Sequence, residues 1–323
     1  MSLFSPDAQR YQRIPYRRSG RSGLQLPSIS LGLWRHFGND SPLATMREIV
    51  RTAFDLGITH FDLANNYGPP PGSAETHFGQ ILQDDLRAYR DELVISTKAG
   101  FPMWPGPYGD FGSKKHLVAS LNQSLRRLGV DYVDIFYHHR PDPATALEET
   151  MGALDAVVRQ GKALYVGISN YDAATAIKAA QILRQLGQRM VIHQPAYSLL
   201  NRWIERDLLA AADQEGFGVI AYSPLARGVL TNPELDRIGA RSDGEDPPAA
   251  RLRELADLAH RRGQTVSQLA LTWVLRDPRV TSALIGVSAA EQLRENIQAV
   301  DAPALSQDEL DRLDRIFPVR DHP

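Results

Sequence analysis

Residues 93–138, LVISTKAGFPMWPGPYGDFGSKKHLVASLNQSLRRLGVDYVDIFYH, form a unit from which the rest of the fold follows. Its two ends, 93–99 and 132–138, are short apolar runs with Val and Ile, which are typical of buried strands. Between them, segment 114–129 carries leucine at helical spacing, which predicts a helix with one apolar face. Two strands joined through a helix pair in parallel with a right-handed crossover, so this stretch predicts a strand–helix–strand unit.

The same alternation continues along the chain and yields eight predicted strands. They are residues 28–34, 60–64, 93–99, 132–138, 163–169, 191–197, 218–223 and 281–287. Eight such units close most naturally into a (β/α)8 TIM barrel. A doubly wound sheet is the alternative, but no G-x-G-x-x-G follows the first strand to support it.

Helix starts and two extra segments complete the predicted architecture. Three capping boxes are expected, at Thr265 with Gln268, Ser288 with Glu291, and Ser306 with Glu309. Residues 14–27 are expected to form a hairpin that turns at Ser22 and Gly23 and plugs the amino-terminal end of the barrel. Residues 231–251 are polar, lack periodicity and contain three prolines, so we expect a rim loop between strands seven and eight that could act as a mobile lid.

Composition excludes several classes of function. The 36 Lys and Arg nearly balance the 38 Asp and Glu, and no basic run is dense enough for nucleic acid. The chain has no cysteine, which excludes disulfides, thiolate nucleophiles and thiolate metal sites. It shows no apolar signal region and no stretch approaching the roughly 20 apolar residues of a membrane span. We expect a cytoplasmic protein with no membrane partner.

Polar side chains lie at the ends of three predicted strands. They are Asp62 and Tyr67 in HFDLANNYG, Lys98 in LVISTKAG, and His139 in YVDIFYHHR. Taken singly, such residues are equally typical of a cap, a turn or a solvated surface. Parallel strands of a barrel, however, end at one rim, where barrel enzymes keep their chemistry, so the set together predicts one pocket.

These residue types can deliver a proton to a carbonyl oxygen. A phenol with a pKa near 10 is a poor acid at neutral pH unless a cation stabilises the phenolate, and Lys98 held by Asp62 is a suitable cation that would lower the pKa of Tyr67. Because successive strand residues point to opposite sides, only one of His138 and His139 can face the pocket.

Seven segments, in order, resemble motifs of the aldo-keto reductase family. They are FDLANNYG, STKAG, DYVDIFYHHR, GISN, IHQPAYSLLNR, YSPLARG and LIGVSAAEQLRENI. The resemblance implies one barrel domain over residues 1–323, with a core from about residue 14 to about residue 317. It also implies a catalytic tetrad of Asp62, Tyr67, Lys98 and His139, with His139 assigned because it lies eight residues after Asp131. His138 is then expected to be structural.

The resemblance further implies a nicotinamide coenzyme. Expected contacts are Trp34, Ser169, Asn170, Gln194, Tyr222, Ser223, Leu225, Gly228, Arg241, Gly286, Ser288, Gln292, Glu295 and Asn296. The nicotinamide carboxamide is expected to be held by Ser169, Asn170 and Gln194. The nicotinamide ring is expected to stack on Tyr222. Expected substrate contacts are Trp34, Tyr67, Trp104, His139 and Arg140.

NADPH is the expected coenzyme, with NADH as an alternative. Positions that carry basic side chains in many family members hold Gly286 and Gln292 here, so a cation for the 2′-phosphate would have to come from Arg227, Arg237 or Arg241. Arg35, Arg140 and Arg227 also flank the rim where a substrate phosphate would lie.

Within the family the chain most resembles a subgroup that contains bacterial L-glyceraldehyde 3-phosphate reductases and, more distantly, potassium-channel beta subunits. The implied function is reduction of small aldehydes, such as L-glyceraldehyde 3-phosphate or methylglyoxal-like carbonyls, to alcohols without a metal. The alternative is a regulatory protein that binds the cofactor and turns over slowly; the channel subunits carry asparagine where this chain has His139, which favours an active enzyme. The sequence leaves a homo-oligomer open.

Overall fold

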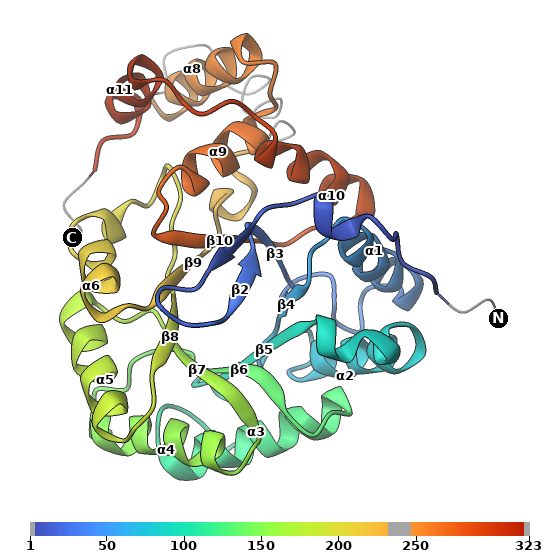
Figure 1. Ribbon diagram of the computed structural model, residues 1–323, viewed down its shortest axis with the longest axis vertical. Coiled ribbons are helices and arrows are strands. Elements are labelled where there is room, and N and C mark those ends of the chain that lie inside the picture. Colours follow the sequence, from blue (N-terminus) through green and yellow to red (C-terminus); the bar gives the residue numbers. More distant parts are fainter. Residues whose placement is uncertain (1–3, 232–246, 320–323) are drawn as a thin grey trace.

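The computed structural model describes residues 4–231 and 247–319, and its strands form a closed parallel barrel in the order β10-β3-β4-β5-β6-β7-β8-β9 (Figure 1). The strands are β3 Ile29–Gly32, β4 His60–Asp62, β5 Val94–Ala99, β6 Val133–His138, β7 Ala163–Ser169, β8 Met190–Gln194, β9 Gly218–Tyr222 and β10 Val280–Ile285. Closure is made where Leu284 of β10 pairs with Ser30 of β3. The (β/α)8 TIM barrel is therefore confirmed, and the doubly wound alternative is wrong.

In the described part of the chain, eight α-helices surround the barrel and two more lie outside this ring. Figure 1 shows the outer two beyond α9. The surrounding helices are α1 Leu43–Asp55, α2 Ser73–Ile81, α3 Lys114–Leu128, α4 Leu147–Arg159, α5 Ala173–Gln185, α6 Leu208–Glu215, α9 Val266–Leu275 and α10 Ala290–Ile297. The outer pair is α8 Pro247–Arg261 and α11 Gln307–Ile316, joined by an ion pair between Arg312 and Glu254. Shorter turns are η1 Arg10–Gln12, η2 Leu82–Leu86, η3 Arg87–Glu92, η4 Trp203–Glu205, η5 Ala226–Gly228 and η6 Gln298–Val300.

Two of the three expected capping boxes form, at the starts of α9 and α11. The third is wrong, because the residue at the N-cap of α10 is Ala289 and not Ser288. The backbone N–H of Ser288 instead donates to Oε1 of Gln292, at 2.8 Å. Ser288 thus lies one residue too early in the loop to cap the helix.

The expected loop at 231–251 also extends too far, because α8 already begins at Pro247. Proline interrupts a helix interior but is tolerated in the first turn, where the backbone N–H has no helical partner, so the two prolines at 247 and 248 mark a helix start. The remainder of the predicted loop, including Arg237 and Arg241, lies at 232–246, outside the described residues.

The amino-terminal hairpin forms as expected from β1 Tyr16–Arg18 and β2 Gln25–Pro27. Figure 1 shows β2 across the centre of the barrel. Leu26 is fully buried among apolar residues of the barrel interior, and Ser19 Oγ donates to the carbonyl of Val191 at 2.8 Å. Gly20 has a φ of 53°, and an added Cβ would lie 2.3 Å from Gly216 O. The hairpin therefore closes the end of the barrel opposite to the strand carboxyl ends.

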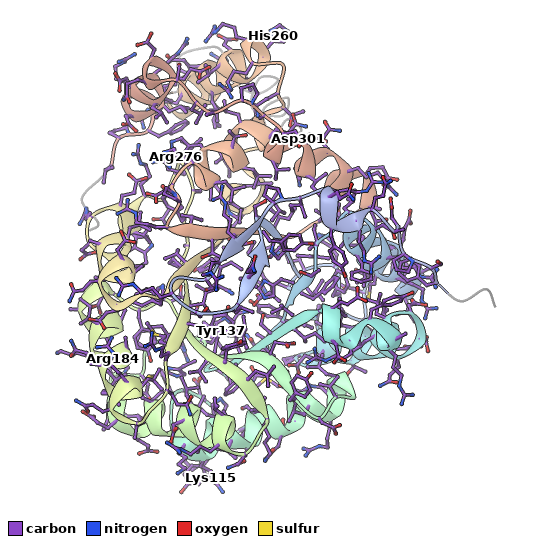
Figure 2. The ribbon with its side chains drawn as sticks, viewed as in Figure 1. Lys115, Tyr137, Arg184, His260, Arg276 and Asp301 are labelled. Atoms are coloured by element: carbon purple, nitrogen blue, oxygen red, sulfur yellow. The ribbon has the colours of Figure 1, made fainter. Side chains whose placement is uncertain are left out.

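The barrel interior is divided into an apolar and a polar part. Ile135, Tyr137, Ile192 and Ile220 cluster on the β6, β8 and β9 side, and Figure 2 shows Tyr137 near the middle of the barrel. The β10, β3, β4 and β5 side instead carries buried serine, histidine, aspartate and lysine side chains. Among the described residues, no helix is both long and apolar enough to cross a membrane.

Candidate active site

The carboxyl ends of β4, β5 and β6 bring together the four residues of the expected tetrad. Asp62 is the last residue of β4, Lys98 is near the end of β5, and His139 directly follows β6. Tyr67 lies in the loop between β4 and α2, with its ring 4.9 Å from Lys98 Nζ and 5.9 Å from the ring of His139. The side chains thus lie together at one rim of the barrel, as the strand ends predicted.

Asp62 and Lys98 form a buried ion pair at the base of this site. Lys98 Nζ lies 2.5 Å from Asp62 Oδ2 and also donates to the carbonyl of Leu63 at 2.6 Å. Asp62 Oδ1 accepts from Ser96 Oγ at 2.6 Å and from Gln194 Nε2 at 3.1 Å. Burial lowers the pKa of Lys98, and the Asp62 carboxylate opposes that shift. The carboxylate is thus the group that keeps this buried lysine charged.

The pKa of Tyr67 differs from the sequence-based expectation. Burial, and then the charge of Asp62, raise it well above its ordinary value of 10. The net lowering expected from the sequence is therefore wrong, because burial disfavours the phenolate and Asp62 balances the ammonium charge of Lys98 at close range. The phenol is therefore protonated at neutral pH, which is the state that a proton donor requires.

His139 is a neutral imidazole beside Tyr67. Burial and then the charge of Lys98 lower its pKa well below 6.5. Its ring packs edge-on against Phe101, with centroids 4.6 Å apart, and its Nδ1 has no hydrogen-bond partner in the described part of the chain. A neutral imidazole can donate an N–H to a carbonyl oxygen without adding a charge to the pocket.

His138 points away from the pocket, as strand alternation requires. Its Nδ1 lies 2.6 Å from the hydroxyl of Tyr171, and a Cβ added to Gly112 would lie 2.9 Å from its ring. Burial lowers the pKa of His138 to about 4. The structure thus places only His139 beside Tyr67 and places His138 between the barrel and its surrounding segments.

The expected carboxamide and ring contacts gather at the ends of β7, β8 and β9. Asn170 Nδ2 donates to the carbonyl of His139 and to Ser169 Oγ, both at 3.0 Å, and Asn170 Oδ1 accepts from the Tyr222 hydroxyl at 2.8 Å. Asn170 has a φ of 63°. Non-glycine residues in this left-handed region cluster at functional sites. The amide nitrogen of Gln194 donates to Asp62, so a carboxamide contact of this residue, which stays a prediction, would use its side-chain oxygen.

The expected phosphate contacts lie in the turn after β9. Ser223, Ala226 and Arg227 all have positive φ values, and a Cβ added to Gly228 would meet no atom within 4 Å. This open, sharply turned backbone suits close approach of a phosphate. The N–H of Gly228 itself donates to the carbonyl of Leu225 at 3.0 Å. A phosphate would therefore have to use other amides of the turn or displace that bond.

The expected adenosine contacts lie beyond β10. Gln292 already holds the Ser288 amide, and the Glu295 carbonyl accepts from Gln268 at 2.9 Å. Asn296 is buried. Gly286 has no side chain that would block the approach of a coenzyme. The residues fit a coenzyme lying along the rim from β7 to β10, although Arg241 is outside the described residues.

Of the expected substrate contacts, Trp34 lies at the site and two others are engaged elsewhere. Trp34 is 46% exposed, with its ring 6.3 Å from that of Tyr67. Trp104 packs on His116 at 5.0 Å. Arg140 pairs with Asp110 at 2.8 Å and lies over the rings of Phe101 and Phe111, so its role as a free phosphate ligand is not supported.

Sequence reasoning missed three residues near the site. Phe101 packs on His139, Ser96 donates to Asp62, and both polar side-chain atoms of Asn65 are buried without a hydrogen-bond partner in the described residues. The only sequence indication was position, because each lies within three residues of a tetrad member. An unpaired buried amide normally requires a partner, so Asn65 is available to a ligand or a water molecule.

Comparisons with known proteins agree with this geometry. A model of the Aldo/keto reductase family matches residues 28–317. The L-glyceraldehyde 3-phosphate reductase of Escherichia coli (strain K12) is 52% identical over 323 residues, covering 95% of this chain and 93% of that protein. A putative voltage-gated potassium channel subunit beta of Schizosaccharomyces pombe is 35% identical, covering 95% and 94%, and a probable one of Arabidopsis thaliana is 34% identical, covering 94% and 97%. The family model matches most of the chain, and the structure has the closed barrel that the family resemblance implied. The chain therefore belongs to the aldo/keto reductase family and is an oxidoreductase.

Proposed function

We propose that this enzyme uses NADPH to reduce small aldehydes, with L-glyceraldehyde 3-phosphate as the leading substrate. The observation that carries the proposal is the position of Tyr67, a protonated phenol whose ring lies 4.9 Å from the ammonium of Lys98 and 5.9 Å from the neutral ring of His139. That arrangement suits protonation of a carbonyl oxygen. The 52% identity to an L-glyceraldehyde 3-phosphate reductase supports the choice of substrate.

The chain's own residues provide the proton and hold the carbonyl. A bound nicotinamide coenzyme supplies the hydride that adds to the carbonyl carbon. Tyr67 donates its phenolic proton to the carbonyl oxygen, and the nearby Lys98 ammonium stabilises the phenolate that remains. Asp62 keeps Lys98 charged, and His139 orients the carbonyl through a ring N–H. Solvent then restores the proton on Tyr67, so the net change is one hydride and one proton added to form the alcohol.

Two cations of the described rim are available to phosphate groups. Arg35 lies over the ring of Trp34 at 4.8 Å, on the substrate side of the site. Arg227 lies after β9, near enough for its charge to lower the pKa of Tyr222, although burial of that phenol acts more strongly in the opposite direction. We assign Arg35 to a substrate phosphate and the arginines at 227, 237 and 241 to the coenzyme 2′-phosphate.

Coenzyme preference provides the test of this assignment. We expect kcat/KM for NADPH to exceed that for NADH by about tenfold to a hundredfold, because one arginine–phosphate hydrogen bond contributes roughly 1.5 to 3 kcal/mol. Arg241→Ala or Arg237→Ala should raise the KM for NADPH with little effect on NADH, while Arg35→Ala should instead affect phosphorylated aldehydes. Steady-state rates with both coenzymes, and with L-glyceraldehyde 3-phosphate and L-glyceraldehyde, measure these effects.

Equal use of both coenzymes by the wild-type enzyme would contradict the assignment of the 2′-phosphate. Failure of every aldehyde with either coenzyme would contradict the reductase function. That result would favour the alternative, a cofactor-binding regulatory protein. The relatives named as potassium channel beta subunits support this alternative.

A further inference from the structure

A continuous row of hydrogen-bonded side chains crosses the polar part of the barrel interior and ends on Asp62. Ser282 Oγ lies 2.7 Å from Ser30 Oγ, which lies 2.9 Å from His60 Nδ1. His60 Nε2 lies 3.0 Å from Ser96 Oγ, which donates to Asp62 Oδ1 at 2.6 Å. All five side chains belong to residues with no exposed surface. We call Ser282, Ser30, His60 and Ser96 the interior chain.

Strand register explains why these residues meet. His60 and Asp62 are two residues apart in β4 and therefore point to the same side, into the barrel. Asp62 pairs with Ser96 of β5, and Ser30 of β3 pairs with Leu284 of β10, whose inward-facing neighbour two residues earlier is Ser282. The interior chain thus spans four adjacent strands, far from solvent, where a hydrogen bond is stronger than in water.

The direction of each hydrogen bond in the interior chain follows from the bond to Asp62. An ionised carboxylate only accepts, so Ser96 donates to Asp62 and its oxygen remains free to accept from His60. His60 must then carry its proton on Nε2 and accept at Nδ1 from Ser30, which in turn accepts from Ser282. All these donors point toward Asp62. Burial lowers the pKa of His60 to about 4, consistent with a neutral ring.

We propose that His60 is a positioning residue that acts through Ser96 to keep the Asp62 carboxylate aimed at Lys98. The inference rests on the proposed reductase function, because Lys98 matters there as the cation beside Tyr67. Each donated hydrogen bond stabilises the charged form of the carboxylate, and consecutive bonds in a buried row polarise one another. His60 touches neither Tyr67 nor any rim residue in its hydrogen bonds, and both of its ring nitrogens are used within the interior chain.

Other ionisable groups act on the Asp62–Lys98 pair and must be considered in any pH profile. They are His60 and Tyr67 near β4, Glu75 of α2, Tyr137 of β6, His139 after β6, and Tyr222 of β9. Glu75 is itself paired with Arg127 at 2.7 Å. The tyrosines here have raised pKa values and His139 a lowered one, so near neutral pH these side chains keep their protonation states. A shift of the alkaline limb in the variants below would then report on Lys98.

The test is the alkaline side of the kcat profile at saturating aldehyde and NADPH. Burial lowers the pKa of Lys98 and its ion pair with Asp62 opposes that shift, so a carboxylate that is held less firmly lets Lys98 lose its proton at a lower pH. Ser96→Ala should move half-maximal kcat on the alkaline side downward by about one pH unit, and His60→Ala by about half a unit. His60→Gln should restore most of the wild-type profile, because its amide can still donate to Ser96. KM should stay within about twofold, since His60 does not contact substrate.

Ser120→Ala is the matched control. Ser120 is fully buried in α3 and its hydroxyl has no hydrogen-bond partner among the described residues, so this variant should leave the profile unchanged. Circular dichroism at each pH and coenzyme-binding titration correct for unfolded protein. Alkaline limbs of Ser96→Ala and His60→Ala that coincide with the wild type would overturn the proposal, even if both variants melt at lower temperature.

A second measurement is independent of turnover. Two-bond ¹H–¹⁵N spectra of histidine-labelled protein should show a neutral His60 with its proton on Nε2 from pH 6 to 8, identified by its absence in His60→Gln. A proton on Nδ1 would overturn the proposal. A wild-type protein that reduces no aldehyde but shows the Nε2 tautomer would contradict the proposed function while leaving the direction of the interior chain intact.

Discussion

Tyr67→Phe is expected to lower kcat for aldehyde reduction by about 10²- to 10⁴-fold, the usual contribution of a general acid. The hydroxyl donates its proton only in the transition state and makes no hydrogen bond to any other described residue, so coenzyme affinity should stay within about twofold. Steady-state rates at saturating substrate and fluorescence titration with NADPH measure the two effects separately.

Tyr137→Phe is the matched control for that substitution. Its ring lies 5.7 Å from the same Lys98 Nζ, but it belongs to β6 and lies inside the barrel, below the rim. Removing this second phenol should change kcat far less than removing the first. Retention of more than about a tenth of the wild-type rate by Tyr67→Phe would remove Tyr67 from the role of proton donor.

His139→Ala is expected to lower kcat/KM by about 10²-fold, the usual loss when one donor to a developing oxyanion is removed. His138→Ala should leave kcat nearly unchanged, because that ring bonds to Tyr171 outside the pocket. It should instead lower the melting temperature, since the buried hydroxyl of Tyr171 would lose its partner. Rates must be normalised to folded protein by coenzyme titration.

Equal losses of activity in the two histidine variants, or a larger loss in His138→Ala, would contradict the assignment of His139. The pKa values add a second check. The pKa of His139 lies well below 6.5, so its ring releases no proton as the pH rises through 6.5. The wild-type pH profile of kcat/KM should therefore show no step there. A step near pH 6.5 that disappears in His139→Ala would show that the imidazole is charged in the working enzyme.

The barrel and the meeting of the four polar residues could be predicted from the sequence because both depend on simple periodicities. Alternation of apolar runs with helical segments determines parallel pairing, and parallel pairing carries the ends of β4, β5 and β6 to one rim. Alternation within β6 likewise separates His138 from His139. The antiparallel hairpin was marked by its glycine-containing turn.

Features that depend on three-dimensional environment could not be predicted in the same way. The raised pKa of Tyr67 results from burial, which a motif does not reveal. Arg140 had the residue type and position for phosphate binding, but Asp110, thirty residues away, already neutralises it. The prolines at 247 and 248 suggested a loop but instead begin α8. Proline is common both in loops and in the first turn of a helix, so the sequence alone does not separate the two.

The interior chain escaped detection for a related reason. Barrel strands are covered on both faces, so their sequences do not alternate cleanly between polar and apolar residues, and a buried serine in β3 resembles any other strand residue. His60 begins the short strand β4 and looks like a strand-start residue. Only the register of β10, β3, β4 and β5 shows that these polar groups form one row.

Transfer of deuterium tests the central claim of aldehyde reduction most directly. Purified protein should be incubated with L-glyceraldehyde 3-phosphate and NADPH that carries deuterium at C4 of the nicotinamide on the transferred side, and the product examined by mass spectrometry. The geometry around Tyr67 predicts a glycerol phosphate with one deuterium at the former carbonyl carbon, formed by the wild type and reduced by at least about 10²-fold in Tyr67→Phe. Recovery of unchanged aldehyde from the wild type, or an alcohol without deuterium, would contradict it.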